Sequence, residues 1–128
     1  MILTQERIER DAKRVLAFAK QGNHQPEGYN TLKSEPSSYG LFLKFWIRMK
    51  GWEYKDAIKY CKMNSAQNLS HWLNHIPQEN WNEFDVTRFS KAFNIQEDYF
   101  IAVVEEIERL RKLEKKDGAI IKRKVRKD

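Results

Sequence analysis

The stretch from residue 63 to residue 76, MNSAQNLSHWLNHI, constrains the fold most, because its apolar residues recur with a helical period. At 100° per residue, four apolar side chains fall on one narrow stripe: Leu69, Trp72, Leu73 and Ile76. Asn64 is a good N-cap residue, and Gln67 three residues later suits the reciprocal half of a capping box. The pattern predicts a helix that begins near Ser65 and buries this stripe.

The opposite side of this predicted helix is polar and almost uncharged. It consists of Gln67, Ser70, His71 and Asn74. These side chains donate and accept hydrogen bonds, as a surface that discriminates between the edges of DNA bases requires. A face that is merely solvated would more often carry Lys and Glu.

Helical patterns also account for most of the remaining chain, and no strand-like alternation or repeat interrupts them. Residues 4–20 predict an amphipathic helix capped by Thr4, and residues 21–38 a linker. A helix before Gly51 should bury Leu41, Phe42, Phe45, Trp46 and Met49. Residues 54–61 should form a helix that buries Ala57, Ile58 and Cys61. Residues 85–94 should bury Val86, Phe89, Ala92 and Phe93, and a last helix should start near Gln96 and reach Leu113.

These elements predict an all-α protein. We expect an N-terminal amphipathic helix (1–20), a linker (21–38), a compact five-helix domain (39–114) and a basic tail (115–128) broken at Gly118. Lys and Arg outnumber Asp and Glu by 24 to 18, which favours a polyanionic partner but is also found in ordinary helical proteins. The chain has no long apolar run and no signal-peptide pattern, so we expect a cytoplasmic protein. Its single cysteine, Cys61, fits a small core residue.

The order of these elements resembles the Cro and lambda-repressor type (Xre-like) of helix-turn-helix DNA-binding domain. The matching stretches are LKFWIRMKGW, YKDAIKYC, NSAQNLSHWLN and VTRFSKAFNIQEDYF, which together span residues 41–100. Ala57 fits the small residue of the family's supporting helix. Cys61 or Lys62 stands where the family has a glycine in the turn, and nothing in the family pattern accounts for residues 1–38.

The resemblance implies sequence-specific binding of double-stranded DNA by a repressor-like transcriptional regulator of prophage or mobile-element type. The second helix of the motif would lie in the major groove and the first would cross the phosphates. The implied base-reading residues are Gln67, Asn68, His71 and Asn74. The implied phosphate-binding residues are Lys55, Lys59, Lys62, Ser65 and Ala66, the last two through backbone amides. Alternatively, Gln67 only caps its helix and the lysines only face solvent.

Other classes of function stay open. A helix-turn-helix scaffold can serve as a small protein-binding inhibitor, with a tryptophan or the loop at residues 74–83 as its aromatic anchor. A non-specific nucleic-acid-binding protein would rely on the basic tail. We expect no enzyme and no cofactor, because the sequence has no catalytic or phosphate-loop motif. His71 and His75 lie one turn apart without a carboxylate between them, so we expect no metal site.

Two apolar stripes extend beyond the expected domain and predict a homodimer. One runs along the last helix through Val104, Ile107 and Leu110, and the other includes Val15 and Phe18 in the N-terminal helix. Contact between two subunits would bury both stripes and set the spacing of two DNA half-sites. The alternative is that the two stripes pack on each other within one chain, since the linker is long enough to allow it.

Overall fold

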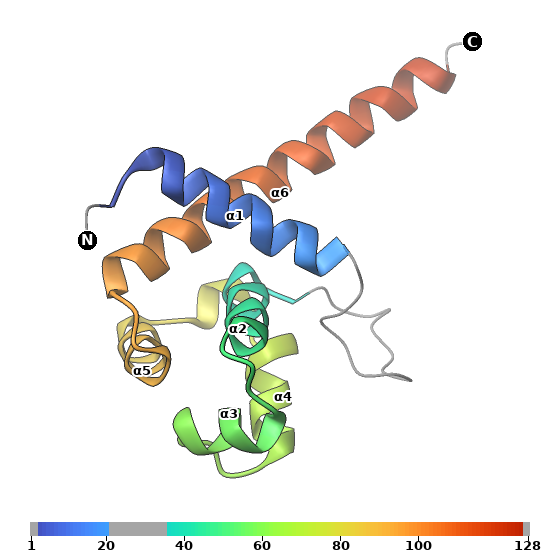
Figure 1. Cartoon of the computed structure of the whole chain (residues 1–128). Helices are drawn as coiled ribbons and strands as arrows, with labels where there is room; N and C mark the ends of the chain where they lie inside the picture. The colour runs from blue at the N-terminus through green and yellow to red at the C-terminus, as the bar shows by residue number, and fades with distance from the viewer. Residues whose placement is uncertain (1–2, 21–35, 127–128) are drawn as a thin grey trace.

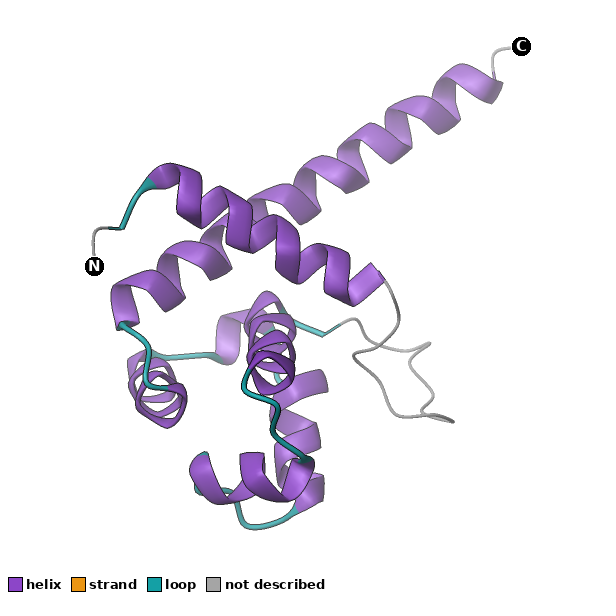
Figure 2. Ribbon diagram, viewed as in Figure 1, coloured by secondary structure: helices purple, strands orange, loops and turns teal. Residues whose placement is uncertain are grey.

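The computed structural model describes residues 3–20 and 36–126. Within these ranges the chain forms α-helices and one 3-10 turn and no strand, which confirms the all-α class (Figures 1 and 2). The helices are α1 (Gln5–Lys20), α2 (Ser38–Met49), α3 (Tyr54–Tyr60), α4 (Ala66–Asn74), α5 (Glu83–Phe93) and α6 (Glu97–Arg126), and the 3-10 turn η1 (Gln78–Asn80) precedes α5.

Side-chain caps determine where several of these helices begin. Thr4 Oγ1 accepts a hydrogen bond from the Arg7 amide at 3.2 Å, as predicted for α1. Ser37 Oγ accepts one from the Gly40 amide at 3.0 Å at the start of α2. Asn82 and Asp85 exchange side-chain bonds with each other's amides in a capping box before α5. Each cap satisfies a first-turn amide that has no acceptor inside its own helix.

The residues that end α2 and α5 have left-handed backbone conformations, with positive φ. Gly51, with φ of 69°, follows α2, and its amide donates to the Arg48 carbonyl at 3.0 Å. Asn94, with φ of 56°, follows α5, and the next amide, that of Ile95, donates to the Ser90 carbonyl at 3.0 Å. Both turns have the bonding pattern of a Schellman motif, which satisfies the last carbonyls of a helix. Gly51 therefore ends its helix as its sequence position predicted.

The core lies between α2 and the helices around it. Its largest fully buried side chains include Phe42 from α2, Leu69 from α4, Phe89 from α5 and Phe100 from α6. Most of the apolar residues predicted to face inward are buried or half-buried. Met49 is an exception, since it is 51% exposed. It is the last residue of α2, and the turn at Gly51 leads the chain away before another helix covers it.

Gly40 allows α2 and α4 to approach each other closely. A Cβ atom built on Gly40 would lie 2.2 Å from the carbonyl oxygen of Leu73 in α4. A contact below 3.0 Å to backbone cannot be relieved by rotating a side chain. The position of α4 relative to α2 therefore depends on the absence of a side chain at Gly40.

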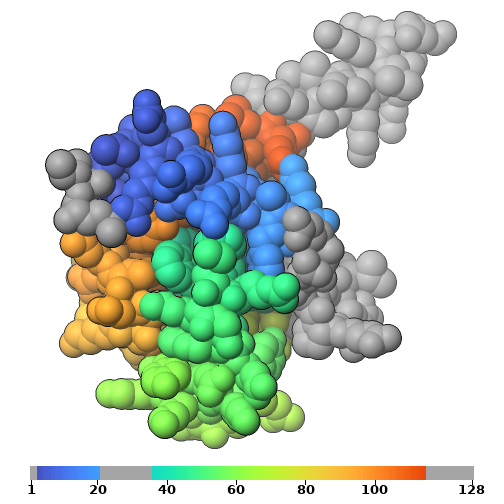
Figure 3. Space-filling model, viewed as in Figure 1, coloured from blue at the N-terminus to red at the C-terminus, as the bar shows by residue number. Residues whose placement is uncertain are grey.

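α1 packs across α6 within the same chain (Figure 1), as the space-filling view also shows (Figure 3). Val104 and Ile107 are almost completely buried, and the α1 residue Val15 is fully buried. The alternative in which the two stripes pack on each other within one chain is therefore the arrangement that the structure has, and it covers Val104 and Ile107. Leu110 is only partly buried. The homodimer itself stays a prediction.

The backbone of α6 is helical through Gly118 and ends at Arg126. The predicted break at Gly118 is therefore wrong, because one glycine inside a helix costs only about 1 kcal/mol relative to alanine and does not end it. In Figure 1 the last turns of α6 extend beyond the other helices. No helix in the described part of the chain is both long and apolar enough to cross a membrane.

Candidate nucleic-acid interface

A five-residue turn joins α3 to α4 and ends α3 in a left-handed conformation. Lys62 has φ of 56°, whereas Cys61 before it is helical. The Lys62 amide donates to the Lys59 carbonyl at 3.2 Å, and the Met63 amide donates to the Ile58 carbonyl at 2.9 Å. Of the two residues considered for the glycine position of this turn, Lys62 is thus the one in the conformation that favours glycine.

Ser65 caps α4. Its Oγ accepts a hydrogen bond from the Asn68 amide at 3.1 Å, and the helix runs from Ala66 to Asn74. The prediction that Asn64 is the cap is therefore wrong by one residue, because Asn64 and Ser65 are both good caps and only Ser65 has the required spacing. Gln67 takes no part in this cap. Its side chain is exposed.

α4 presents a polar outer face over a buried apolar one. Leu69 and Leu73 are buried, as predicted, while Gln67 and His71 are exposed. Asn68 lies at the edge of the outer face and is half-buried. The rings of His71 and His75 lie 5.9 Å apart, centroid to centroid, on the outside of the helix. The exposed residues keep the hydrogen-bonding groups that base recognition needs.

Asn74 does not belong to this outer face, so its prediction as a base-reading residue is wrong. It is only 4% exposed. Its Oδ1 accepts a hydrogen bond from Lys44 Nζ, and its Nδ2 donates to the Ser70 carbonyl at 3.0 Å. Asn74 therefore ties α4 to α2, and its amide is not available to a ligand.

Sequence reasoning missed Lys44, the α2 partner of Asn74. Lys44 is 5% exposed, and burial lowers its pKa from 10.5 to about 8. Among the described residues no carboxylate forms an ion pair with it, which is costly for a buried ammonium group. The signal was its position as a charged residue inside the apolar run LFLKFWI. A lysine at such a position indicates a buried hydrogen-bond acceptor nearby.

The predicted phosphate-binding lysines are all exposed and lie on α3 or its following turn. Lys55 lies 3.4 Å from Glu53 in an ion pair whose two side chains are largely exposed. Lys59 lies over the ring of Tyr60, with Nζ 5.8 Å from its centroid. Lys62 lies in the turn between α3 and α4, three residues before Ser65. Ser65 and Ala66 at the start of α4 are exposed as well.

Arg88 of α5, which sequence reasoning also missed, supports α4 from the side. Its guanidinium carbon lies 4.9 Å from the centroid of the Trp72 ring and 4.8 Å from that of Phe89. Asp85 holds it by an ion pair of 3.6 Å. Stacking of this kind contributes about 0.5–1 kcal/mol at exposed sites and more where water is excluded. Arg88 therefore helps to determine how α4 lies on α5.

The four tryptophans belong to the core or its edge. Trp81 is buried against Trp72, with ring centroids 5.0 Å apart, and Trp46 and Trp52 are half-buried. None of the four is fully exposed.

Among the described residues, no group of three or more His, Cys, Asp or Glu side chains is placed to hold a metal ion. The chain matches no protein-family model, and comparison with curated proteins and with solved structures gives no match either.

Proposed function

We propose that this protein binds double-stranded DNA sequence-specifically and regulates transcription, as a repressor-like protein of prophage or mobile-element type. α3 and α4 would act as a helix-turn-helix pair, with α4 in the major groove and α3 across the phosphates. The observation that carries the proposal is the outer face of α4. Gln67 and His71 are exposed there, and Lys59 and Lys62 are exposed on the preceding helix and turn.

Each exposed group has a chemical role in this proposal. The Gln67 amide can pair with N6 and N7 of adenine, and His71 and the half-buried Asn68 can contact neighbouring base edges. Lys55, Lys59 and Lys62 would contact phosphates and supply affinity that does not depend on sequence. The cap at Ser65 leaves the amides at the start of α4 to face a phosphate.

The supports of α4 favour this role, because a rigid helix loses little conformational freedom on binding. Gly40 permits close packing on α2, the Lys44–Asn74 hydrogen bond ties the same two helices, and Arg88 stacks against Trp72. A misplacement of the recognition helix of about 1 Å would break bidentate hydrogen bonds to bases. A helix supported on several sides is suited to reading them.

The proposal is tested by selecting bound duplexes from a random pool and measuring affinity for the recovered site. Gln67→Ala should weaken or relax site preference by about 1–3 kcal/mol while the melting temperature stays unchanged. Lys59→Ala is the matched control. It should reduce the slope of log affinity against log salt concentration by about one and leave the preference for the selected site intact. Unchanged affinity after joint replacement of Gln67, Asn68 and His71 by alanine would show that α4 does not read DNA.

The basic segment at residues 115–127 would add non-specific affinity. It contains seven Lys or Arg, namely Lys115, Lys116, Lys122, Arg123, Lys124, Arg126 and Lys127. Truncation after Glu114 should flatten the salt dependence and spare the site preference. A loss of preference with an unchanged salt slope would reverse this assignment.

A second candidate function is binding to another protein, and one observation favours it. Phe84, at the start of α5, is 87% exposed. A large aromatic side chain in this position is suited to a pocket on a partner, where aromatic anchors dominate affinity. The selection of duplexes from a random pool separates the two functions, because a protein that binds only another protein would enrich no duplex sequence.

A further inference from the structure

A cleft of about 340 Å³ lies where four segments meet, separate from α3 and α4. Arg7 comes from α1, Trp46 from α2, Lys50 from the end of α2, and Tyr99 from α6. The turn between α5 and α6 contributes Asn94, Ile95 and Gln96. Pockets for small ligands have volumes from about 300 Å³ upwards and combine apolar walls with a few polar groups. This cleft meets both conditions.

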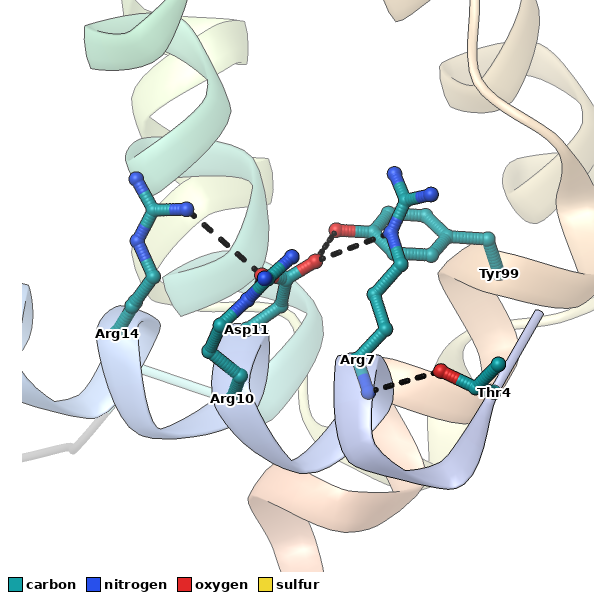
Figure 4. A network of polar contacts seen from close by, with 6 residues as sticks. All are labelled: Thr4, Arg7, Arg10, Asp11, Arg14 and Tyr99. Atoms are coloured by element: carbon teal, nitrogen blue, oxygen red, sulfur yellow. Dashed lines mark hydrogen bonds and ion pairs between the residues drawn. The ribbon is translucent and has the colours of Figure 1, made fainter. Parts of the chain in front are cut away.

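The charged groups that line the cleft are all cations. The Arg7 guanidinium lies 5.3 Å from the centroid of the Tyr99 ring, and Lys50 Nζ lies 5.8 Å from that of Trp46. Figure 4 shows the Arg7 side chain rising from α1 across the Tyr99 ring. No Asp or Glu lines the cleft. Both cations therefore lie beside aromatic walls, which suits a ligand that is negatively charged at one end and apolar at the other.

A neighbouring network on α1 joins three arginines to one buried carboxylate. Asp11 is buried, and its carboxylate accepts a hydrogen bond from Tyr99 Oη at 2.7 Å. Arg7, Arg10 and Arg14 surround the same carboxylate at 3.8, 3.4 and 3.7 Å (Figure 4). Arg7 and Lys50 are the charged residues that line the adjacent cleft, and this charge favours an anionic ligand.

We infer that the cleft binds a small aromatic carboxylic acid in its ionised form. The aromatic ring of the ligand packs against Trp46 and Tyr99, while its carboxylate pairs with Lys50 and Arg7. Asn94 and Gln96 line the same cleft, and their side-chain amides can donate hydrogen bonds to polar substituents on the ring or accept them. The site does not depend on the proposed reading of DNA, because none of its residues belongs to α3 or α4.

The test is an NMR titration of the uniformly ¹⁵N-labelled full chain. Benzoate is the probe, and benzamide is its uncharged analogue. The indole resonance of Trp46, assigned by its loss in Trp46→Phe, reports on the cleft. We expect a saturable shift with benzoate and none with benzamide at the same concentration. Lys50→Gln should weaken benzoate binding roughly tenfold, since it removes a charge-assisted bond.

Arg10→Gln is the matched control, because Arg10 also contacts Asp11 but does not line the cleft. It should leave benzoate affinity within about twofold of the parent, since its charge is largely exposed and screened. The absence of a saturable shift, equal binding of benzamide, or unchanged affinity in Lys50→Gln would overturn the inference. Displacement of benzoate by a DNA duplex would also overturn it, by assigning the cleft to a nucleic-acid surface.

Discussion

Replacement of the buried Lys44 by methionine should remove a pH dependence of stability that the parent protein has. The Lys44 side chain is 5% exposed, and its polar partner among the described residues is the uncharged Asn74. Burial lowers its pKa from 10.5 to about 8. Between these two pH values the unfolded chain holds a proton on Lys44 that the folded chain has lost. The contribution of Lys44 to the free energy of unfolding therefore rises with pH across this window.

The size of the effect follows from the two pKa values. A difference of 2.5 units, from 10.5 to about 8, corresponds to roughly 3 kcal/mol in all, of which about 2.5 kcal/mol is gained between pH 7 and pH 10. Cys61 acts in the opposite direction, because burial raises its pKa from 9 to about 11 and the folded chain keeps the thiol proton there. This contribution is common to parent and variant, so it cancels in their difference.

Urea unfolding of the parent and of Lys44→Met at several pH values from 7 to 10 measures this difference directly. The free energy of unfolding of the variant minus that of the parent should fall by about 2.5 kcal/mol from pH 7 to pH 10. Lys50→Met is the matched control, since Lys50 lies on the surface at the end of the same helix. A constant difference between parent and Lys44→Met over this range would refute the burial of a titrating lysine.

Three further substitutions test the packing. Gly40→Ala should lower stability by about 1–3 kcal/mol, seen as a lower urea midpoint, because its methyl group would overlap the Leu73 carbonyl. Lys62→Gly should raise stability by about 0.5–1 kcal/mol and raise the melting temperature, because φ at this position is 56°. Ile107→Glu should cost roughly 4 kcal/mol by placing a charge under α1, and light scattering should show no change of mass in the remaining folded protein. A stable Ile107→Glu variant with half the parent's mass would instead restore a subunit contact there.

Local signals predicted the helices well, because the residues that begin and end a helix act through neighbours in the sequence. Thr4 caps α1 and Gly51 ends α2 as expected. The cap of α4 was misplaced because Asn64 and Ser65 are equally good candidates by residue type. Only the distance from the Ser65 hydroxyl to an amide distinguishes them.

Contacts between helices could not be predicted in the same way. Periodicity placed Asn74 on the polar side of α4, opposite the apolar stripe, and this side was expected to face away from the core. Its burial depends on Lys44, 30 residues earlier, and on the close approach at Gly40. The stripes of α1 and α6 likewise matched each other equally well within one chain or between two. A sequence pattern identifies an apolar surface but not its partner.

The hydrogen bond between Asp11 and Tyr99 joins residues 88 positions apart, and this separation has a consequence for protein synthesis. At 5–20 residues per second, a ribosome needs roughly 5–20 s to make the chain between them. During that time α1 and α2, which contact each other in the fold, have been made, but α6 has not. The part of α1 that packs on α6 therefore stays uncovered until the last helix has been made, and α1 cannot complete its packing before then.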